Sequence, residues 1–106
     1  MTTIYGLKTC DTCRKAIKAL PGATLRDIRA QPLTAAEIAG FLDAFGEALV
    51  NRASTTWRGL DEAARAQTPQ ALLAAHPALM KRPVIAAGGA LHLGWTPATR
   101  AALGVD

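Results

Sequence analysis

The sequence predicts an α/β fold. Strand-like segments occur near both ends of the chain and helix signals fill the middle, so the order is β-α-β, a helical stretch, then β-β-α. Half of the 106 residues are apolar, which is enough for a core without disulfide support. The two cysteines are three positions apart, and a bond between them would close too short a loop to add much stability.

The N-terminal part predicts a strand, a helix and a second strand. Thr2–Tyr5 is short and strand-like, and the residues after it have the apolar stripe of an amphipathic helix over about 11–20. Pro21-Gly22 ends this helix. Residues 23–28, which lie between turn residues, predict the second strand.

The middle of the chain predicts helices. Thr34 and Glu37 form a capping-box pattern, in which each side chain accepts a backbone N–H at the start of a helix. We expect that helix to end at Gly46. A short helix is expected over residues 61–66, and Thr68-Pro69 is a typical start for another, ending near Ala75.

The C-terminal part predicts a hairpin and a last helix. Val84–Ala87 and Leu91–Leu93 are short apolar segments on either side of two glycines, and Thr96-Pro97 begins a helix. The full order of elements is that of a thioredoxin-like fold with a helical insertion. We therefore expect residues 1–106 to form a single thioredoxin-like domain with the insertion at about 34–80.

Charge and hydropathy limit the classes of partner. The net charge is +4 and the isoelectric point is near 9.6, but the twelve Lys and Arg residues are spread along the chain among only five aromatic residues. This pattern is typical of a solvated surface, so we expect no direct binding of nucleic acid. The sequence contains neither a run of roughly 18 apolar residues nor a signal-like N-terminus, which predicts a cytoplasmic protein that does not bind membranes.

The cysteine pair is the strongest candidate for chemistry. Cys10 and Cys13 follow the first strand where a helix begins, a position at which backbone N–H groups and the helix dipole favour thiolate over thiol. Lys8, Arg14 and Lys15 add positive charge around the same turn. The helix stripe predicts that Cys13 faces the core and that Cys10 stays accessible. Both are candidate catalytic residues.

Other interpretations of these residues remain open. The two thiols could be an inert pair. A zinc site would need two more ligands, and His76 and His92 lie in a helix end and a hairpin strand, so we expect no metal. Trp57 is expected to be a core or cover residue rather than part of the site.

Three stretches carry a resemblance to a known family: Ile4–Thr12, Asn51–Glu62, and Lys81–Val84 followed by Leu93-Gly94. On these stretches the chain resembles the arsenate reductase-like (ArsC/Spx) family, and within it the YffB and Spx branch. Thr55–Arg58 resembles YffB-type proteins, whereas the second cysteine resembles Spx, whose Cys-x-x-Cys acts as a disulfide switch.

The resemblance implies a set of site residues. It implies a nucleophilic Cys10, and an anion-binding Arg82 beside Pro83, a proline that is cis in relatives. A cis Arg82-Pro83 bond is physically accessible because X-Pro is the linkage at which the cis form costs only about 0.5–1 kcal/mol. Arg52 lies near the position of a second family arginine. Arg52, Arg82 and Pro83 are therefore candidate substrate-binding residues, although either arginine could instead be a solvated surface residue.

The expected function is thiol–disulfide chemistry. We expect glutathione to be the co-substrate, with no bound cofactor, and Cys10 to attack an oxidised sulfur substrate. The alternative is an Spx-like regulator that binds RNA polymerase and uses the cysteine pair as a sensor. Arsenate reduction ranks third, because arsenate reductases of this family place three arginines around the cysteine and no arginine is present at Trp95-Thr96.

Overall fold

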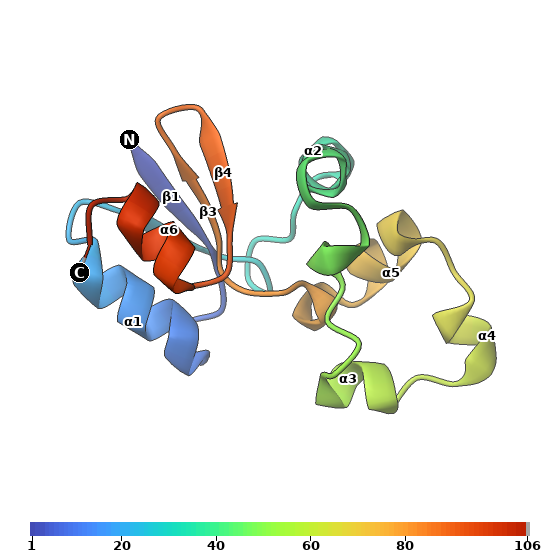
Figure 1. Ribbon diagram of the computed structural model, residues 1–106. Coiled ribbons are helices and arrows are strands. Elements are labelled where there is room, and N and C mark those ends of the chain that lie inside the picture. The colour runs from blue at the N-terminus through green and yellow to red at the C-terminus, as the bar shows by residue number, and fades with distance from the viewer. Residues whose placement is uncertain (106) are drawn as a thin grey trace. The chain divides into compact units, whose positions relative to one another are not determined.

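The fold of residues 1–105 is described by a computed structural model and contains one mixed four-stranded sheet (Figure 1). The strand order is β2-β1-β3-β4. β1 (Thr2–Gly6) pairs in parallel with β2 (Thr24–Asp27) and antiparallel with β3 (Val84–Ala87). β3 then pairs antiparallel with β4 (Ala90–Leu93). The predicted α/β class and the C-terminal hairpin are both confirmed.

The chain divides into two compact units. Met1–Gln31 and the C-terminal segment from Arg82 form the first, which we call the sheet unit. Pro32–Lys81 forms the second, the helical unit. Residues 34–80, the expected insertion, fall within the helical unit.

The sheet unit has its core between the central strands and α1 (Asp11–Ala19). Ile4 of β1 lies opposite Ile85 of β3, and both are fully buried together with Ala16 of α1. Burying each such aliphatic side chain contributes about 1.5–3 kcal/mol. Apolar residues packed around this cluster are Ile17, Leu20, Ala23, Leu25, Trp95 and Leu103.

Element ends in the sheet unit differ from the predictions by one or two residues. α1 stops at Ala19 with Leu20 as its C-cap, just before the expected proline and glycine. β2 is shorter than the predicted 23–28, and Ile28, just after its end, is buried and donates its N–H to the Gly6 carbonyl of β1. The last helix, α6 (Pro97–Ala102), begins where Thr96-Pro97 predicted.

The helical unit confirms the predicted caps. Thr34 Oγ1 accepts the Glu37 N–H at 3.1 Å, and the Glu37 carboxylate accepts the Thr34 N–H at 2.8 Å, which completes the capping box of α2 (Ala35–Phe45). This helix ends at Gly46, where φ is +61°. The two later predicted helices are α4 (Glu62–Arg65) and α5 (Pro69–Ala75).

One short helix was missed by the sequence analysis. α3 (Thr55–Arg58) has only four residues, too few for a periodic apolar stripe, and it is started by Ser54, whose Oγ accepts the Trp57 N–H at 3.1 Å. The guanidinium groups of Arg52 and Arg65 lie 5.3 and 5.4 Å from the Trp57 ring centre. The Trp57 side chain is partly buried, and its role stays a prediction. Two 3₁₀ turns, Gly46–Leu49 and Pro77–Leu79, complete this unit.

Within residues 1–105, no helix combines the length and the apolar character that a membrane crossing requires.

Candidate active site

The two cysteines take the positions that the helix pattern predicted. Cys10 is the N-cap residue of α1, in extended backbone conformation, and is half-buried. Cys13, one turn into the helix, is fully buried. Both are free thiols. The accessible thiol is therefore the first of the pair, as expected of a nucleophile.

Arg82 and Pro83 enter the same part of the sheet unit immediately before β3. The Arg82-Pro83 peptide bond is cis, which confirms the prediction. Pro83 is fully buried, and Arg82 is partly exposed. The Arg82 guanidinium interacts with the Cys10 sulfur both as a hydrogen-bond donor and through its charge. The structure thus brings Cys10, Cys13 and Arg82 together.

The environment of Cys10 favours its thiolate form. Burial acts against the charge and raises the pKa of the Cys10 thiol, but hydrogen-bonding groups outweigh it, so the pKa is lowered overall. These groups are the Cys13 backbone N–H, the Cys13 thiol and the Arg82 guanidinium. The Cys10 side chain makes no regular N-cap hydrogen bond. The Cys13 N–H therefore interacts with the Cys10 sulfur in a less ideal geometry than an N-cap hydrogen bond has.

Cys13 has the opposite character. Burial, together with the neighbouring Cys10, raises the pKa of its thiol to about 11, although the Leu7 backbone and Arg82 act in the other direction. At neutral pH Cys13 is therefore a protonated thiol that can donate its S–H to the Cys10 sulfur. The pair consists of a thiolate and a thiol donor, rather than two equal nucleophiles.

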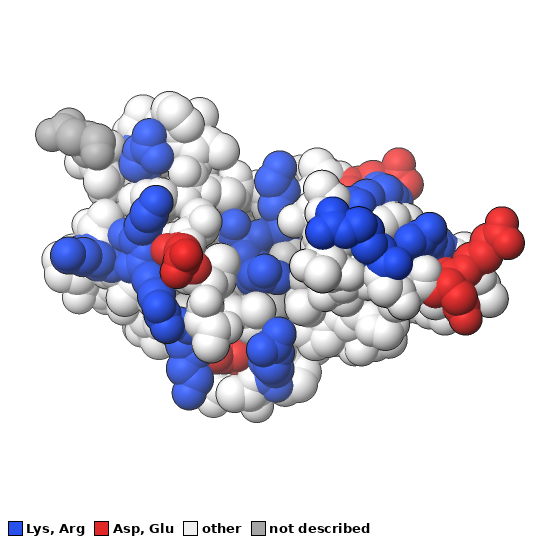
Figure 2. Space-filling view, turned by 90° about the horizontal axis from the view of Figure 1, so that it is seen from below, with Lys and Arg blue, Asp and Glu red and all other residues white. Residues whose placement is uncertain are grey.

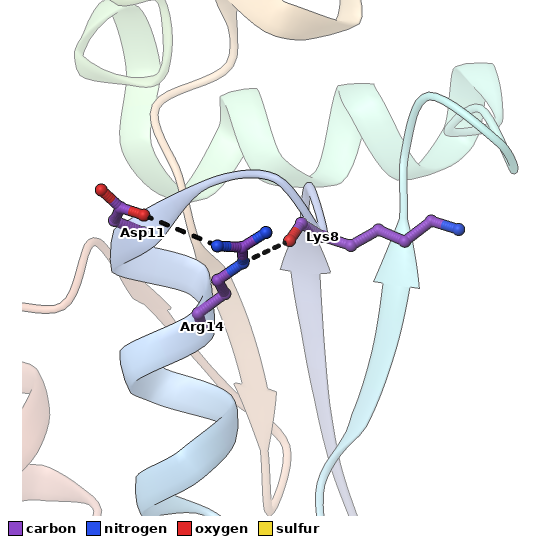
Figure 3. A network of polar contacts seen from close by, with 3 residues as sticks. All are labelled: Lys8, Asp11 and Arg14. Atoms are coloured by element: carbon purple, nitrogen blue, oxygen red, sulfur yellow. Dashed lines mark hydrogen bonds and ion pairs between the residues drawn. The ribbon is translucent and has the colours of Figure 1, made fainter.

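The source of positive charge differs from the sequence prediction. Arg14 donates from Nε to the Lys8 carbonyl at 2.8 Å and lies 3.9 Å from the Asp11 carboxylate, while the Lys8 ammonium extends away from Arg14 (Figure 3). Arg82, from a distant part of the sequence, is the cation that lowers the pKa of Cys10. Lys8, Arg14 and Lys15 are not among the main causes of the lowered pKa of Cys10, because nearness in sequence does not direct a side chain toward the sulfur.

Gly6 allows the helix to approach the strand at this point. A Cβ on Gly6 would overlap the Cys13 sulfur and would come within 3.9 Å of the Pro83 Cβ. Only hydrogen fits there, so the last residue of β1 determines how closely Cys13 can lie to the sheet.

We expect Gly6→Ala to destabilise the fold by about 1–3 kcal/mol, since the added methyl group must displace the buried Cys13. Urea unfolding measures this change. Gly40→Ala is a matched control, because Gly40 lies inside α2 with open space around it, and there the substitution should be neutral or stabilising by up to about 1 kcal/mol. Equal stability of Gly6→Ala and the parent would contradict the close packing.

Arg52 belongs to the helical unit. Besides stacking on Trp57, its Nη2 lies 3.4 Å from the Glu47 carboxylate. Its role in binding substrate stays a prediction.

Among residues 1–105, no three His, Cys, Asp or Glu side chains are grouped in a way that could hold a metal ion.

Lys and Arg side chains cover more of the face shown in Figure 2 than Asp and Glu do. This excess fits small anionic substrates.

Asp27 contacts the turn that carries Cys10, and the sequence analysis did not single it out. It ends β2 beside Gly6 of β1, and its carboxylate accepts the Lys8 backbone N–H at 3.2 Å, two residues before Cys10. A signal was available: parallel strands bring their carboxyl ends to the same sheet edge, so a polar residue ending the second strand lies beside the turn after the first.

Comparison with known proteins identifies the family of this site. The sequence model of the ArsC family matches residues 5–103, nearly the whole chain. The chain belongs to the ArsC family. Its fold is the thioredoxin-like fold of that family, which confirms the predicted class. The finer resemblance to Spx is not shown.

Relatives of this ArsC-family chain match it over most of their length. An uncharacterized protein of Haemophilus influenzae is 38% identical over 104 residues, with 90% of this chain and 91% of the relative covered. The solved structure of a protein named YFFB is 32% identical, covers 96% of this chain and 97% of its own, and superimposes with a TM-score of 0.88. An arsenate reductase (ArsC) related protein from Brucella melitensis is 37% identical, with 95% and 92% covered and a TM-score of 0.73.

Proposed function

We propose that this chain is a glutathione-dependent thiol–disulfide oxidoreductase with Cys10 as its nucleophile. The observation that carries the proposal is the pairing of the half-buried Cys10 sulfur with the Arg82 guanidinium, which lowers the pKa of the thiol. A thiolate at neutral pH is the reactive form in sulfur exchange. Membership of the arsenate reductase-like family agrees with this chemistry.

The first step is attack on an oxidised sulfur substrate. The Cys10 thiolate forms a bond to one sulfur of a disulfide, the S–S bond breaks, and the other sulfur leaves as a thiolate that takes a proton from water. The product is a mixed disulfide on Cys10. Arg82 and the backbone N–H of Cys13 stabilise charge on sulfur as it moves between the two partners.

An external thiol completes the cycle. Glutathione attacks the mixed disulfide, and a second glutathione finishes the reduction, so that two glutathione thiols are oxidised to one disulfide for each substrate disulfide reduced. The high pKa and full burial of Cys13 favour its role as a donor to Cys10 over that of a resolving nucleophile. Arg82, positioned by the cis bond to the buried Pro83, is proposed to bind a carboxylate of glutathione or substrate.

The experiment that tests this function is a turnover assay with glutathione and a small mixed disulfide, coupled to NADPH oxidation through glutathione reductase. We expect turnover that depends on the concentrations of glutathione and of the chain. An unchanged background rate at every concentration of the chain would contradict the proposal.

We expect arsenate to be a poor substrate. An arsenate dianion needs several fixed donors to replace its hydration. Arg82 is the guanidinium that interacts with the Cys10 sulfur, and Trp95 and Thr96 lack the third arginine of the family pattern. The same coupled assay with arsenate measures this. Turnover with kcat/KM on the order of 10⁴ M⁻¹s⁻¹, the low end for ordinary enzymes, would contradict the expectation.

One observation favours a second function. The Cys13 thiol interacts directly with Cys10, so oxidation could join the pair and change the turn that holds them. This is the chemistry of a redox-sensing regulator of the Spx type that binds RNA polymerase. A pull-down with purified polymerase, with and without oxidant, tests it: redox-dependent capture together with no turnover would favour the regulator.

A further inference from the structure

The turn that carries Cys10 lies beside the end of β2. Gly6 of β1 pairs with Asp27 of β2, and the Ile28 N–H donates to the Gly6 carbonyl at 2.9 Å. The end of β2 therefore lies beside the start of the turn that follows β1. Residues in that segment are placed to contact the turn, although about twenty positions of sequence separate them.

Asp27 makes such a contact with its carboxylate. Oδ1 accepts the backbone N–H groups of Arg29 and Ala30 at 2.9 and 3.2 Å, which hold the carboxylate in one orientation. Oδ2 accepts the Lys8 N–H at 3.2 Å. Two bonds within its own loop thus fix Asp27 as an acceptor for the turn.

Arg14 binds the backbone carbonyl of Lys8, whereas Asp27 binds its N–H. Its Nε donates to the Lys8 carbonyl at 2.8 Å, and Figure 3 shows the guanidinium between that carbonyl and the Asp11 carboxylate. The turn itself is closed by the Cys10 N–H, which donates to the Leu7 carbonyl at 3.0 Å. The N–H and the C=O of Lys8 are both held by side chains from outside the turn.

We infer that Asp27 and Arg14 are positioning residues, which hold the two sides of Lys8 and thereby fix the Cys10 sulfur against Arg82 and the Cys13 N–H. The inference rests on the proposed function, because it assigns the pair to the proposed nucleophile. Hydrogen bonds to an ionised sulfur depend on distance and direction, so a shift of the turn weakens each of them. Asp27 and Arg14 act on Cys10 without touching the sulfur.

The ionisation of Asp27 suits this role. The Lys8 N–H is the main cause that lowers the pKa of the Asp27 carboxyl, helped by the Ala30 and Arg29 N–H groups and the Lys8 charge, while slight burial opposes it. The carboxylate is therefore charged throughout the neutral range. Its own titration does not interfere with a measurement of Cys10 between pH 6 and 10.

The test is the rate of Cys10 alkylation by iodoacetamide as a function of pH, measured in a Cys13→Ser background so that one thiol remains. Asp27→Ala should raise the apparent pKa of Cys10 by about one unit and lower the rate at pH 7 by up to about tenfold. Asp27→Asn has one acceptor oxygen for the three N–H groups that the two carboxylate oxygens accept, so its profile should lie between those of the parent and Asp27→Ala.

Asp61→Ala is the matched control. Asp61 accepts the Ala64 N–H at 2.8 Å as the cap of α4 in the helical unit, so its loss removes a comparable hydrogen bond and should not shift the apparent pKa of Cys10. Arg14→Met removes the donor to the Lys8 carbonyl and should shift the profile in the same direction as Asp27→Ala. It also serves as the second variant if Asp27→Ala does not fold.

A profile of folded Asp27→Ala or Arg14→Met that superimposes on the parent would overturn the inference. So would an equal shift in Asp61→Ala, since the effect would then be general destabilisation. Alkylation needs no substrate and no glutathione. If the chain shows no turnover, the proposed function is rejected. The alkylation comparison still decides whether Asp27 and Arg14 are positioning residues.

Discussion

Replacing Cys10 with Ser is expected to lower glutathione-dependent turnover by at least about 10³-fold. A serine hydroxyl stays protonated at neutral pH, and its oxygen cannot form the mixed disulfide on which the cycle depends. The measurement is kcat/KM for the mixed disulfide in the coupled assay. Thermal unfolding of the variant should match the parent, because Cys10 is half-buried and the change removes little packing.

Cys13→Ser is the control for this prediction. A serine at the buried position keeps a hydroxyl donor toward the Cys10 sulfur, so turnover should fall by less than about tenfold if glutathione resolves the mixed disulfide. Equal loss in the two variants would show instead that Cys13 is the resolving nucleophile. Retained activity in Cys10→Ser would remove Cys10 from the mechanism.

Replacing Arg82 with Met is expected to raise the apparent pKa of Cys10 by about one to two units. The guanidinium acts on the sulfur as a donor and as a charge, and a methionine of similar length supplies neither. The thiolate fraction at pH 7 falls about tenfold for each unit, and the alkylation rate falls with it. The alkylation profile in the Cys13→Ser background measures the shift.

Arg82→Lys separates charge from geometry. An ammonium keeps the positive charge but loses the planar set of donors, so its profile should lie between those of the parent and Arg82→Met. If the Arg82→Met profile matches the parent, the lowered pKa of Cys10 does not come from Arg82. The Cys13 N–H and thiol would then carry the whole effect.

Most of the fold could be predicted from local patterns. The stripe containing Cys13 and Ala16 correctly assigned the buried side of α1, and the Thr34 capping box correctly placed the start of α2. These signals work because each depends on residues within a few positions of one another. α3 was not predicted, because a four-residue helix is too short for a periodic apolar pattern and is marked only by its N-cap residue, Ser54.

The site was harder to predict because its contacts join distant parts of the sequence. Sequence proximity suggested Lys8, Arg14 and Lys15 as the cations near Cys10, whereas the sheet brings Arg82 to the sulfur from more than seventy positions away. Arg82 itself was chosen from family resemblance, not from the residue pattern. Asp27 had no motif at all, and its contact with Lys8 follows only from the parallel pairing of β1 with β2.

The central claim is that Cys10 is an activated thiolate, and the alkylation profile of the Cys13→Ser chain tests it most directly. Iodoacetamide reacts with the thiolate, so the pH of half-maximal rate reports the pKa of Cys10. The account predicts a half-maximum below roughly 8.5, the value of an ordinary cysteine. A half-maximum at or above that value would contradict the account.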